Sequence, residues 1–291
     1  MQNKKHQKLK CRVKIISDSE GAVEILMKIY SVAAATMPVP EGYGSFHLSF
    51  FVCVILLTVL LCALFKDASE KTVKKITLSL WDIMLLFEIY KQAIFGLSVN
   101  DGVFSFDYAW YTFPFQFCST PLYILPIIAF SKKARVRDCC LAYMMTYSLF
   151  AGLFVLCYPG DVFIDIVGIN FQTMIHHGLQ IVIGVLYAVR YRERLKPGFF
   201  LGGTLVFAAM VLIAVVLNEI FYRALSALGI CDTFNMFYIS PYFTETVPVL
   251  GRVYPDIPYA LLVGGYFLGF VLLGFLTFSA VSRLAKCAKN E

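Results

Sequence analysis

The chain is 291 residues long, and 59% of its residues are hydrophobic while only 15% are charged. With a mean hydropathy of +0.73, this composition lies far outside the range of soluble domains and predicts a protein that crosses the bilayer several times. The net charge of +6 is concentrated in the N-terminal tail and in short loops, a distribution that membrane topology explains, so we expect no nucleic-acid partner.

Residues 1–45 are expected to form a basic N-terminal tail followed by an amphipathic segment. No apolar stretch with a small-residue cleavage site follows the lysines of the tail, so we do not expect a secretory signal. Residues 20–38 could cross the membrane as an extra helix, but Glu24 and Lys28 are unfavourable there. We favour a helix that lies in the outer interface and turns four residues to lipid: Ile25, Leu26, Ile29 and Tyr30.

Seven later stretches are long and apolar enough to cross the hydrocarbon core, which takes about 20 residues of helix. They cover residues 47–65, 76–97, 108–130, 138–158, 170–190, 199–223 and 257–282. The sequence therefore predicts an all-α, polytopic membrane bundle, in which residues 46–283 form one domain of seven transmembrane helices. Residues 284–291 are expected to form a cytoplasmic tail.

Lysine and arginine are distributed unequally among the loops that join these helices. Loops 66–75, 131–137 and 190–198 are rich in them, whereas loops 98–107 and 159–169 contain neither. Because basic loops stay in the cytoplasm, the first group is predicted to be cytoplasmic and the second external.

The third window carries a polar run in which Cys118 lies between Pro114 and Pro121. Both prolines remove a backbone donor, so the hydrogen-bond ladder must break near the cysteine, and membranes tolerate such breaks only where backbone faces protein or water. Measured along a helix from Tyr108, the thiol would lie ~15 Å deep. Its polar neighbours in the sequence are Gln116, Ser119 and Thr120.

Two adjacent histidines in the fifth window are the second unusual feature. Gln172, His176 and Gln180 recur at every fourth position and form one polar stripe, whereas His177 points about 100° away. His176 is therefore predicted to face the bundle interior, at a depth that it can share with Cys118.

Further polar residues lie in the second and sixth windows. Glu88 can pair with Lys91 one turn away, which lowers the cost of burying either charge. We expect this pair to be structural, and we expect Glu88 and Asn218 to support a site rather than to react.

Each of these features also has a structural explanation. A cysteine in a membrane helix is usually a small hydrophobe, and the chain has nine cysteines. A buried histidine can be satisfied by a hydrogen bond to Gln180 or Glu88 as readily as it can act as a base. A transporter or receptor with a polar pocket stays open, as does a zinc hydrolase with Cys118, His176 and Glu88 as ligands.

Four short runs together resemble a known family: GYGSFHLSF at the first window, PFQFCSTPLYILP in the third, MIHHGLQ in the fifth and FNMFYISP before the last. Over roughly residues 40–283 the chain resembles the bacterial YwaF-like membrane proteins and their animal relatives, the transmembrane protein 164 acyltransferases. The androgen-induced-gene membrane hydrolases, which use a threonine nucleophile, are more distantly similar.

The resemblance implies an acyltransferase that moves a fatty acyl chain between phospholipids in a bacterial cytoplasmic membrane, without metal or cofactor. The nucleophilic cysteine of the family corresponds to Cys118. Its histidine falls on the adjacent pair, where the polar stripe favours His176 and keeps His177 in reserve. Membrane phospholipids or lysophospholipids are the implied partners, and the oligomeric state is left open.

The chemistry suits these residue types. A thiol becomes a competent nucleophile when an imidazole takes its proton, and the resulting thioester can pass the acyl group to a hydroxyl. The oxyanion could be stabilised by backbone N–H groups near Pro121 or by the side chains of Gln116, Ser119 or Thr120.

Overall fold

The structure is a computed structural model that describes residues 13–15, 20–100, 103–160, 162–230, 233–247, 251–253 and 257–287. Most of the predicted basic tail, residues 1–12 and 16–19, and the end of the predicted cytoplasmic tail, residues 288–291, lie outside the described residues. The helices are α1 (Glu20–Ala33), α2 (Ser45–Phe65), α3 (Glu70–Gly96), α4 (Pro121–Phe130), α5 (Ala134–Tyr143), α6 (Leu149–Cys157), α7 (Val167–Arg190), α8 (Pro197–Ala227) and α9 (Tyr259–Cys287).

Within the described chain, four helices are long and apolar enough to cross a membrane: α2, Ala134–Cys157, α8 and α9 as far as Ala285. The second of these is α5 and α6 joined without interruption by η3 (Met144–Ser148), a π-helical turn. The predicted all-helical bundle is confirmed, and four of the seven windows match these spans. Helices α3 and α7 form as the second and fifth windows predict but are not among the four, so a total of seven crossings stays a prediction.

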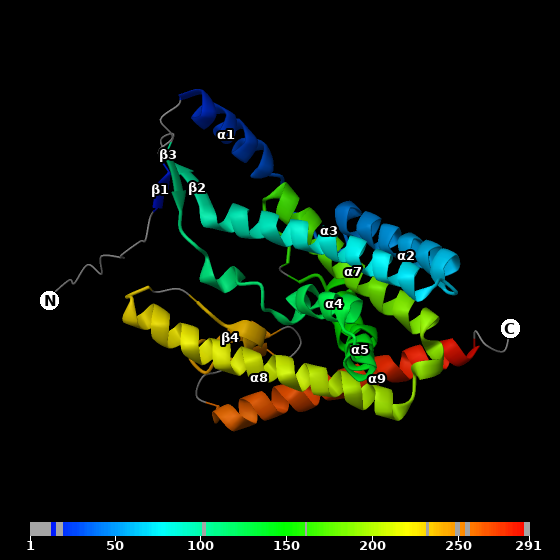
Figure 1. The fold of residues 1–291 in the computed structure, drawn as a ribbon. Coiled ribbons are helices and arrows are strands. Elements are labelled where there is room, and N and C mark those ends of the chain that lie inside the picture. The colour runs from blue at the N-terminus through cyan, green and yellow to red at the C-terminus, as the bar shows by residue number, and fades with distance from the viewer. Residues whose placement is uncertain are drawn as a thin grey trace.

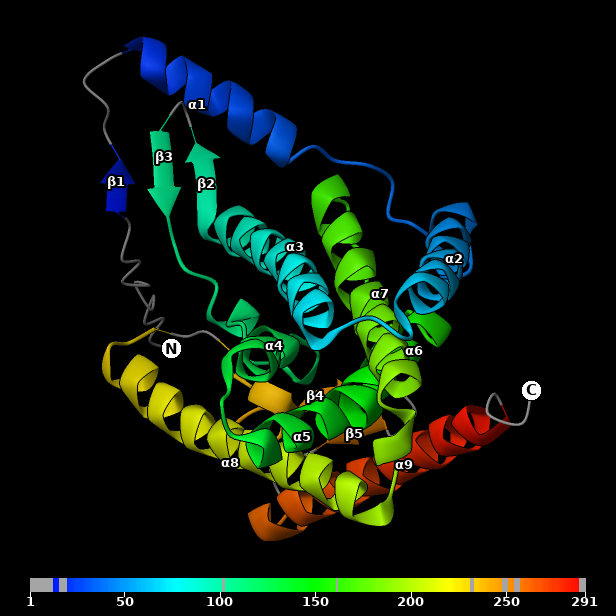
Figure 2. The same cartoon turned by 45° about the vertical axis from the view of Figure 1, so that its right-hand side comes forward.

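Helix α7 occupies the centre of the bundle, between α2 and α3 and against α6 (Figures 1 and 2). Small residues allow the close approach. A Cβ on Gly152 of α6 would lie 2.6 Å from the carbonyl oxygen of His177, and one on Gly178 would lie 2.5 Å from Val54 of α2. The polar residues of α7 therefore face protein rather than lipid.

The prediction of one continuous helix over residues 108–130 is wrong. Two separate 3₁₀ turns, η1 (Trp110–Thr112) and η2 (Phe117–Ser119), precede α4, which begins only at Pro121. A helix of the 10 residues of α4 is about 15 Å long, half the hydrocarbon thickness. Because residues 108–116 form one short 3₁₀ turn and no α-helix, the helical estimate of the depth of Cys118 does not apply.

Side chains replace the donors that the prolines remove. Pro121 leaves the carbonyl of Phe117 without its helical partner, and the Thr120 hydroxyl donates to it at 2.8 Å. Pro126 does the same to the carbonyl of Leu122, which accepts from the indole N–H of Trp81 on α3 at 2.9 Å. The broken segment is thus satisfied by protein groups, as the membrane interior demands.

Small sheets, which the all-α prediction omitted, flank the bundle. Strands β1 (Val13–Ile15), β3 (Val103–Phe106) and β2 (Leu97–Asn100) form an antiparallel sheet in that order. Strands β4 (Glu245–Val247) and β5 (Gly251–Val253) form a separate antiparallel pair.

Helix α1 packs against the first sheet, at the end of the bundle away from the end of α9 (Figure 1). Ile25, Leu26 and Ile29 are exposed, as predicted for lipid-facing residues. Tyr30 is not: its ring packs on Phe104, and its hydroxyl donates to the Leu97 carbonyl at 3.2 Å. Fourteen residues of helix extend about 21 Å, too short for an eighth crossing of the ~30 Å core.

The three basic loops gather at one end of the bundle. Glu70 lies 3.5 Å from Arg190 and 3.9 Å from Arg137, and it accepts a hydrogen bond from the Tyr191 hydroxyl at 3.0 Å. At another place in the bundle, loop 159–169 meets the segment that precedes α2, where the N–H of Met37 donates to the Asp165 carbonyl at 2.8 Å.

Candidate functional site

Cys118 lies in η2, at the break between the irregular segment and α4. As a whole residue it is partly exposed, whereas Ser119 and Thr120 beside it are buried. Cys118 therefore sits where the backbone changes direction, between the irregular segment and the helix.

Two side chains of α7 converge on the peptide carbonyl of Cys118. His176 Nε2 lies 3.0 Å from this oxygen, and Gln180 Nε2 donates to it at 2.8 Å. Both side chains are buried, at 2% and 0% exposure. A carbonyl oxygen can only accept, so Nε2 of His176 must carry the proton, and its basic lone pair is on Nδ1. The structure thus brings Cys118, His176 and Gln180 together, although the imidazole contacts the peptide and not the thiol.

His177 has the opposite arrangement. Its Nδ1 lies 2.7 Å from the carbonyl oxygen of Thr173 one turn earlier on α7, so Nδ1 carries the proton. The two imidazole rings are 5.9 Å apart and inclined by 67°. His177 is therefore held by a hydrogen bond within its own helix. The hydrogen bond of His176 instead reaches the segment that carries Cys118.

Gln116 and Asn218 hold a backbone loop. Gln116 donates to the Asn235 carbonyl at 2.8 Å and accepts from the Phe237 N–H at 2.9 Å. Asn218 on α8 donates to the Met236 carbonyl at 3.0 Å and accepts from its N–H at 2.7 Å. Phe237 has a φ of 59°, a conformation that is rare for bulky residues and that surrounding bonds must maintain.

The two hydroxyl residues after Cys118 have different partners. Thr120 donates to the Phe117 carbonyl and lies 2.7 Å from the buried Tyr143 hydroxyl. The Ser119 side chain lies near the Cys118 side chain. Of the residues expected to stabilise an oxyanion, Gln116 and Thr120 are thus engaged elsewhere, and Ser119 lies beside the thiol.

A buried ion pair lies near the site, on α3. Lys91 Nζ is 2.8 Å from Glu88 Oε1, which confirms the expected pair. Gln92 also donates to this oxygen, at 2.6 Å, and to the Thr112 carbonyl at 2.7 Å. Both members of the pair lie within electrostatic range of Cys118, and their charges are opposite.

The zinc alternative finds no support in the geometry. In the part of the chain that the structure describes, no three His, Cys, Asp or Glu side chains are grouped to hold a metal ion. Of the proposed ligands, His176 directs its Nε2 to a carbonyl and Glu88 directs one oxygen to Lys91.

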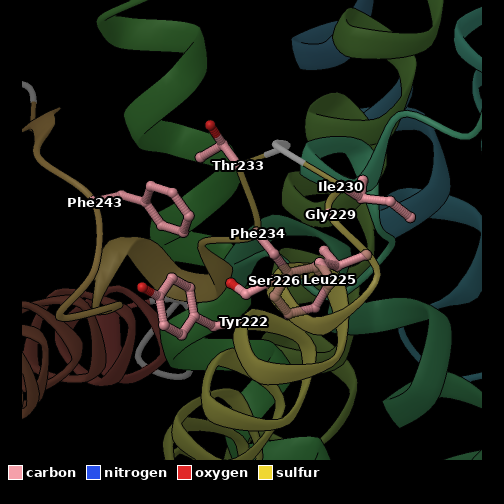
Figure 3. A pocket seen from close by; sticks show the side chains of 8 residues that line it. All are labelled: Tyr222, Leu225, Ser226, Gly229, Ile230, Thr233, Phe234 and Phe243. Atoms are coloured by element: carbon pink, nitrogen blue, oxygen red, sulfur yellow. The ribbon is translucent and has the colours of Figure 1, made fainter. Parts of the chain in front are cut away.

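A cavity of about 470 Å³ lies near the end of α8, apart from the cysteine (Figure 3). Aromatic rings and small polar groups line it: Tyr222, Leu225, Ser226, Gly229, Ile230, Thr233, Phe234 and Phe243. Phe234 immediately precedes the loop that Gln116 and Asn218 hold. This cavity was not expected from the sequence, because its walls come from α8 and from separate parts of the following loop.

Two further buried residues of the site were missed by sequence reasoning. Tyr143 binds the Thr120 hydroxyl, and Asn235 accepts from Gln116 through its carbonyl while its side chain accepts from the Ser240 N–H at 2.8 Å. Both are single polar groups in apolar or aromatic surroundings, which is the available sequence signal.

The fold and the site define an all-helical integral membrane protein with cysteine, histidine and glutamine residues in contact in its interior. The chain belongs to the TMEM164 family, whose family model matches residues 42–279. This match confirms the predicted resemblance to transmembrane protein 164, whereas the resemblance to the YwaF-like proteins and to the hydrolases stays a prediction. Comparisons with curated proteins and with solved structures gave no match.

Proposed function

We propose that the protein is an acyltransferase of a bacterial cytoplasmic membrane, which moves a fatty acyl chain from a phospholipid to a lysophospholipid through a thioester on Cys118. Membership of the TMEM164 family supports an integral membrane protein with the predicted sequence motifs. The chemical steps are argued from the residues around Cys118.

The observation that carries the proposal is the convergence of His176 and Gln180 on the Cys118 carbonyl. A thiol nucleophile needs a base beside it, and this contact supplies an imidazole whose free lone pair is on Nδ1. Proton transfer requires the Cys118 side chain to turn its sulfur toward Nδ1. Rotation about the Cα–Cβ bond moves the sulfur without moving the carbonyl that His176 and Gln180 bind.

The reaction then has two halves. Nδ1 takes the thiol proton, sulfur attacks an ester carbonyl of the donor lipid, and the ester C–O bond breaks as the imidazolium protonates the departing oxygen. In the second half a hydroxyl of the acceptor gives its proton to Nδ1 and attacks the thioester. The C–S bond breaks, and the proton returns to sulfur.

Each half passes through an oxyanion that needs hydrogen-bond donors. We assign this role to the Ser119 hydroxyl, because it lies beside the thiol while Gln116 and Thr120 are bound elsewhere. Ser119→Ala should then slow both halves.

The proposal is tested with purified protein in vesicles that contain a phospholipid with a labelled acyl chain and an unlabelled lysophospholipid. The wild type should transfer label to the acceptor, and Cys118→Ala should lose at least 10²-fold in rate. Cys53→Ala, which removes an exposed cysteine of α2, is the matched control and should retain transfer. Normal transfer by Cys118→Ala would overturn thiol catalysis, whereas absence of transfer by the wild type would favour the transporter or receptor alternative.

A further inference from the structure

We propose that His176 Nδ1 and Gln180 Oε1 together bind a water molecule, so that the protein also hydrolyses the acyl-enzyme and releases a free fatty acid. The inference rests on the proposed thioester at Cys118. It adds a second activity and assigns Gln180 a role in it.

The side chains of His176 and Gln180 have a fixed orientation. His176 and Gln180 each use an N–H to bind the same carbonyl oxygen, at 3.0 and 2.8 Å. Reversing the Gln180 amide would place two oxygens against each other, so this orientation is the favourable one. The donors of both groups that face Cys118 are therefore committed, and the opposite atoms, Nδ1 and Oε1, are both acceptors.

The two acceptor atoms, Nδ1 and Oε1, are buried and form no hydrogen bond within the described part of the chain. Neither His176 Nδ1 nor Gln180 Oε1 has a hydrogen-bond partner among the described residues. The two side chains lie one turn apart on α7 and bind the same oxygen, so their free acceptors belong to the same stretch of the helix. Buried polar atoms are normally paired, which makes two orphaned acceptors one turn apart a place for a ligand that donates.

The number of hydrogen bonds that a ligand can donate distinguishes water from a lipid hydroxyl. A lipid hydroxyl donates one hydrogen bond and leaves one acceptor unpaired, whereas water donates two. A buried water typically makes two to four hydrogen bonds to otherwise unsatisfied polar groups. The pair of acceptors beside Cys118 therefore fits water better than it fits a single hydroxyl.

The chemistry balances without any other reactant. With the acyl group on sulfur, water gives one proton to Nδ1 and its oxygen attacks the thioester carbon, while the other proton stays on that oxygen and donates a hydrogen bond to Gln180 Oε1. The C–S bond breaks, the fatty acid leaves, and the imidazolium returns its proton to the sulfur.

The test separates the two half-reactions. Protein is acylated briefly with labelled phospholipid, the donor is removed, and loss of the adduct is followed in ¹⁸O-water without acceptor. We expect fatty acid carrying one ¹⁸O, released much faster than from denatured acyl-protein. Gln180→Met should slow this release about 3- to 10-fold, the weight of one hydrogen bond, and should change the acylation rate much less. Gln172→Met, on the same helix and also buried, is the matched control and should leave the release rate unchanged.

The possible outcomes are distinct. If the wild type forms no adduct, the proposed function and this inference both fail. If the adduct forms but is released no faster than from denatured protein, only this inference fails. An equal loss of both half-reactions in Gln180→Met would assign Gln180 to holding the carbonyl alone. Should that variant unfold, Gln180→Glu keeps an acceptor oxygen and should retain more hydrolysis, relative to acylation, than Gln180→Leu.

Discussion

Cys118 is positioned through its peptide carbonyl and not through its thiol. Two donors from α7 bind this oxygen, so the backbone is held by contacts that do not involve the sulfur. A nucleophile that must reach a lipid ester and then present a thioester to an acceptor benefits from this combination. The arrangement also separates the two histidines, because only His176 reaches the cysteine segment.

The two histidines should differ in their effect on the rate of acylation. His176→Ala removes the base and one of the two bonds to the Cys118 carbonyl, and it should slow acylation of the cysteine by about 10²–10⁴-fold, the usual weight of a general base. His177→Ala loses a hydrogen bond within α7 and should cost less than tenfold. Single-turnover acylation measures both, and equal losses in the two variants would remove the distinction on which the assignment rests.

Sequence periodicity predicted part of this site and missed the rest for a physical reason. Gln172, His176 and Gln180 share a face because helical spacing dictates it, and two of them contact Cys118. The loop at 235–237, however, is bound by Gln116 and by Asn218. Gln116 and Asn235 are 119 positions apart, and no local pattern encodes such a contact.

At the scale of elements, α7 can hold the site because α6 packs closely against it at Gly152, which has no side chain. Gly152→Ala would place a Cβ 2.6 Å from the His177 carbonyl and 3.0 Å from Gln180 Cβ. Backbone cannot yield as a flexible side chain does. We expect the variant to lose roughly 1–3 kcal/mol of stability and, because α7 must shift, at least tenfold in acyl transfer.

Gly264→Ala is the control for this prediction. It adds the same methyl group to α9, where nothing lies within 4 Å, and alanine is the better helix former. Thermal unfolding in detergent should show a lower midpoint for Gly152→Ala and no loss for Gly264→Ala. Equal midpoints would mean that the two helices separate easily and that their close approach does not position the histidines.

The elements themselves were predictable where hydropathy and secondary structure agree. Helices α2, α8 and α9 follow from their apolar length, whereas the third window was apolar enough for a span but contains Pro114, Pro121 and Pro126, which its irregular structure reflects. The hairpin of β2 and β3 has a signal in the sequence at its turn. Alternating residues flank Asn100, Asp101 and Gly102, a combination typical of tight hairpin turns.

The whole molecule presents two chemically different ends. Loops rich in lysine and arginine meet around Glu70, and loop 159–169, which has neither, meets the segment before α2 at Asp165. This segregation is what the predicted topology requires, since the basic end would remain in the cytoplasm.

Single-cysteine variants test that orientation in intact cells. An impermeant thiol reagent should label Asp107→Cys from outside and should reach Lys133→Cys and Lys196→Cys only after the membrane is opened. All three positions are exposed, so access and not burial decides the result. Labelling of Lys133→Cys from outside would show that the orientation is the reverse of the predicted one, with the basic end in the external medium.

The central claim is that an acyl group passes through Cys118, and the intermediate itself is the most direct test. Purified protein is mixed with labelled phospholipid without acceptor, quenched rapidly in acid and analysed by intact mass. The account predicts one acyl group on the wild type, its removal by hydroxylamine, none on Cys118→Ala, and more on Gln180→Met because discharge to water is slower. A preparation active in transfer that carries no acyl group on Cys118 under these conditions would contradict it.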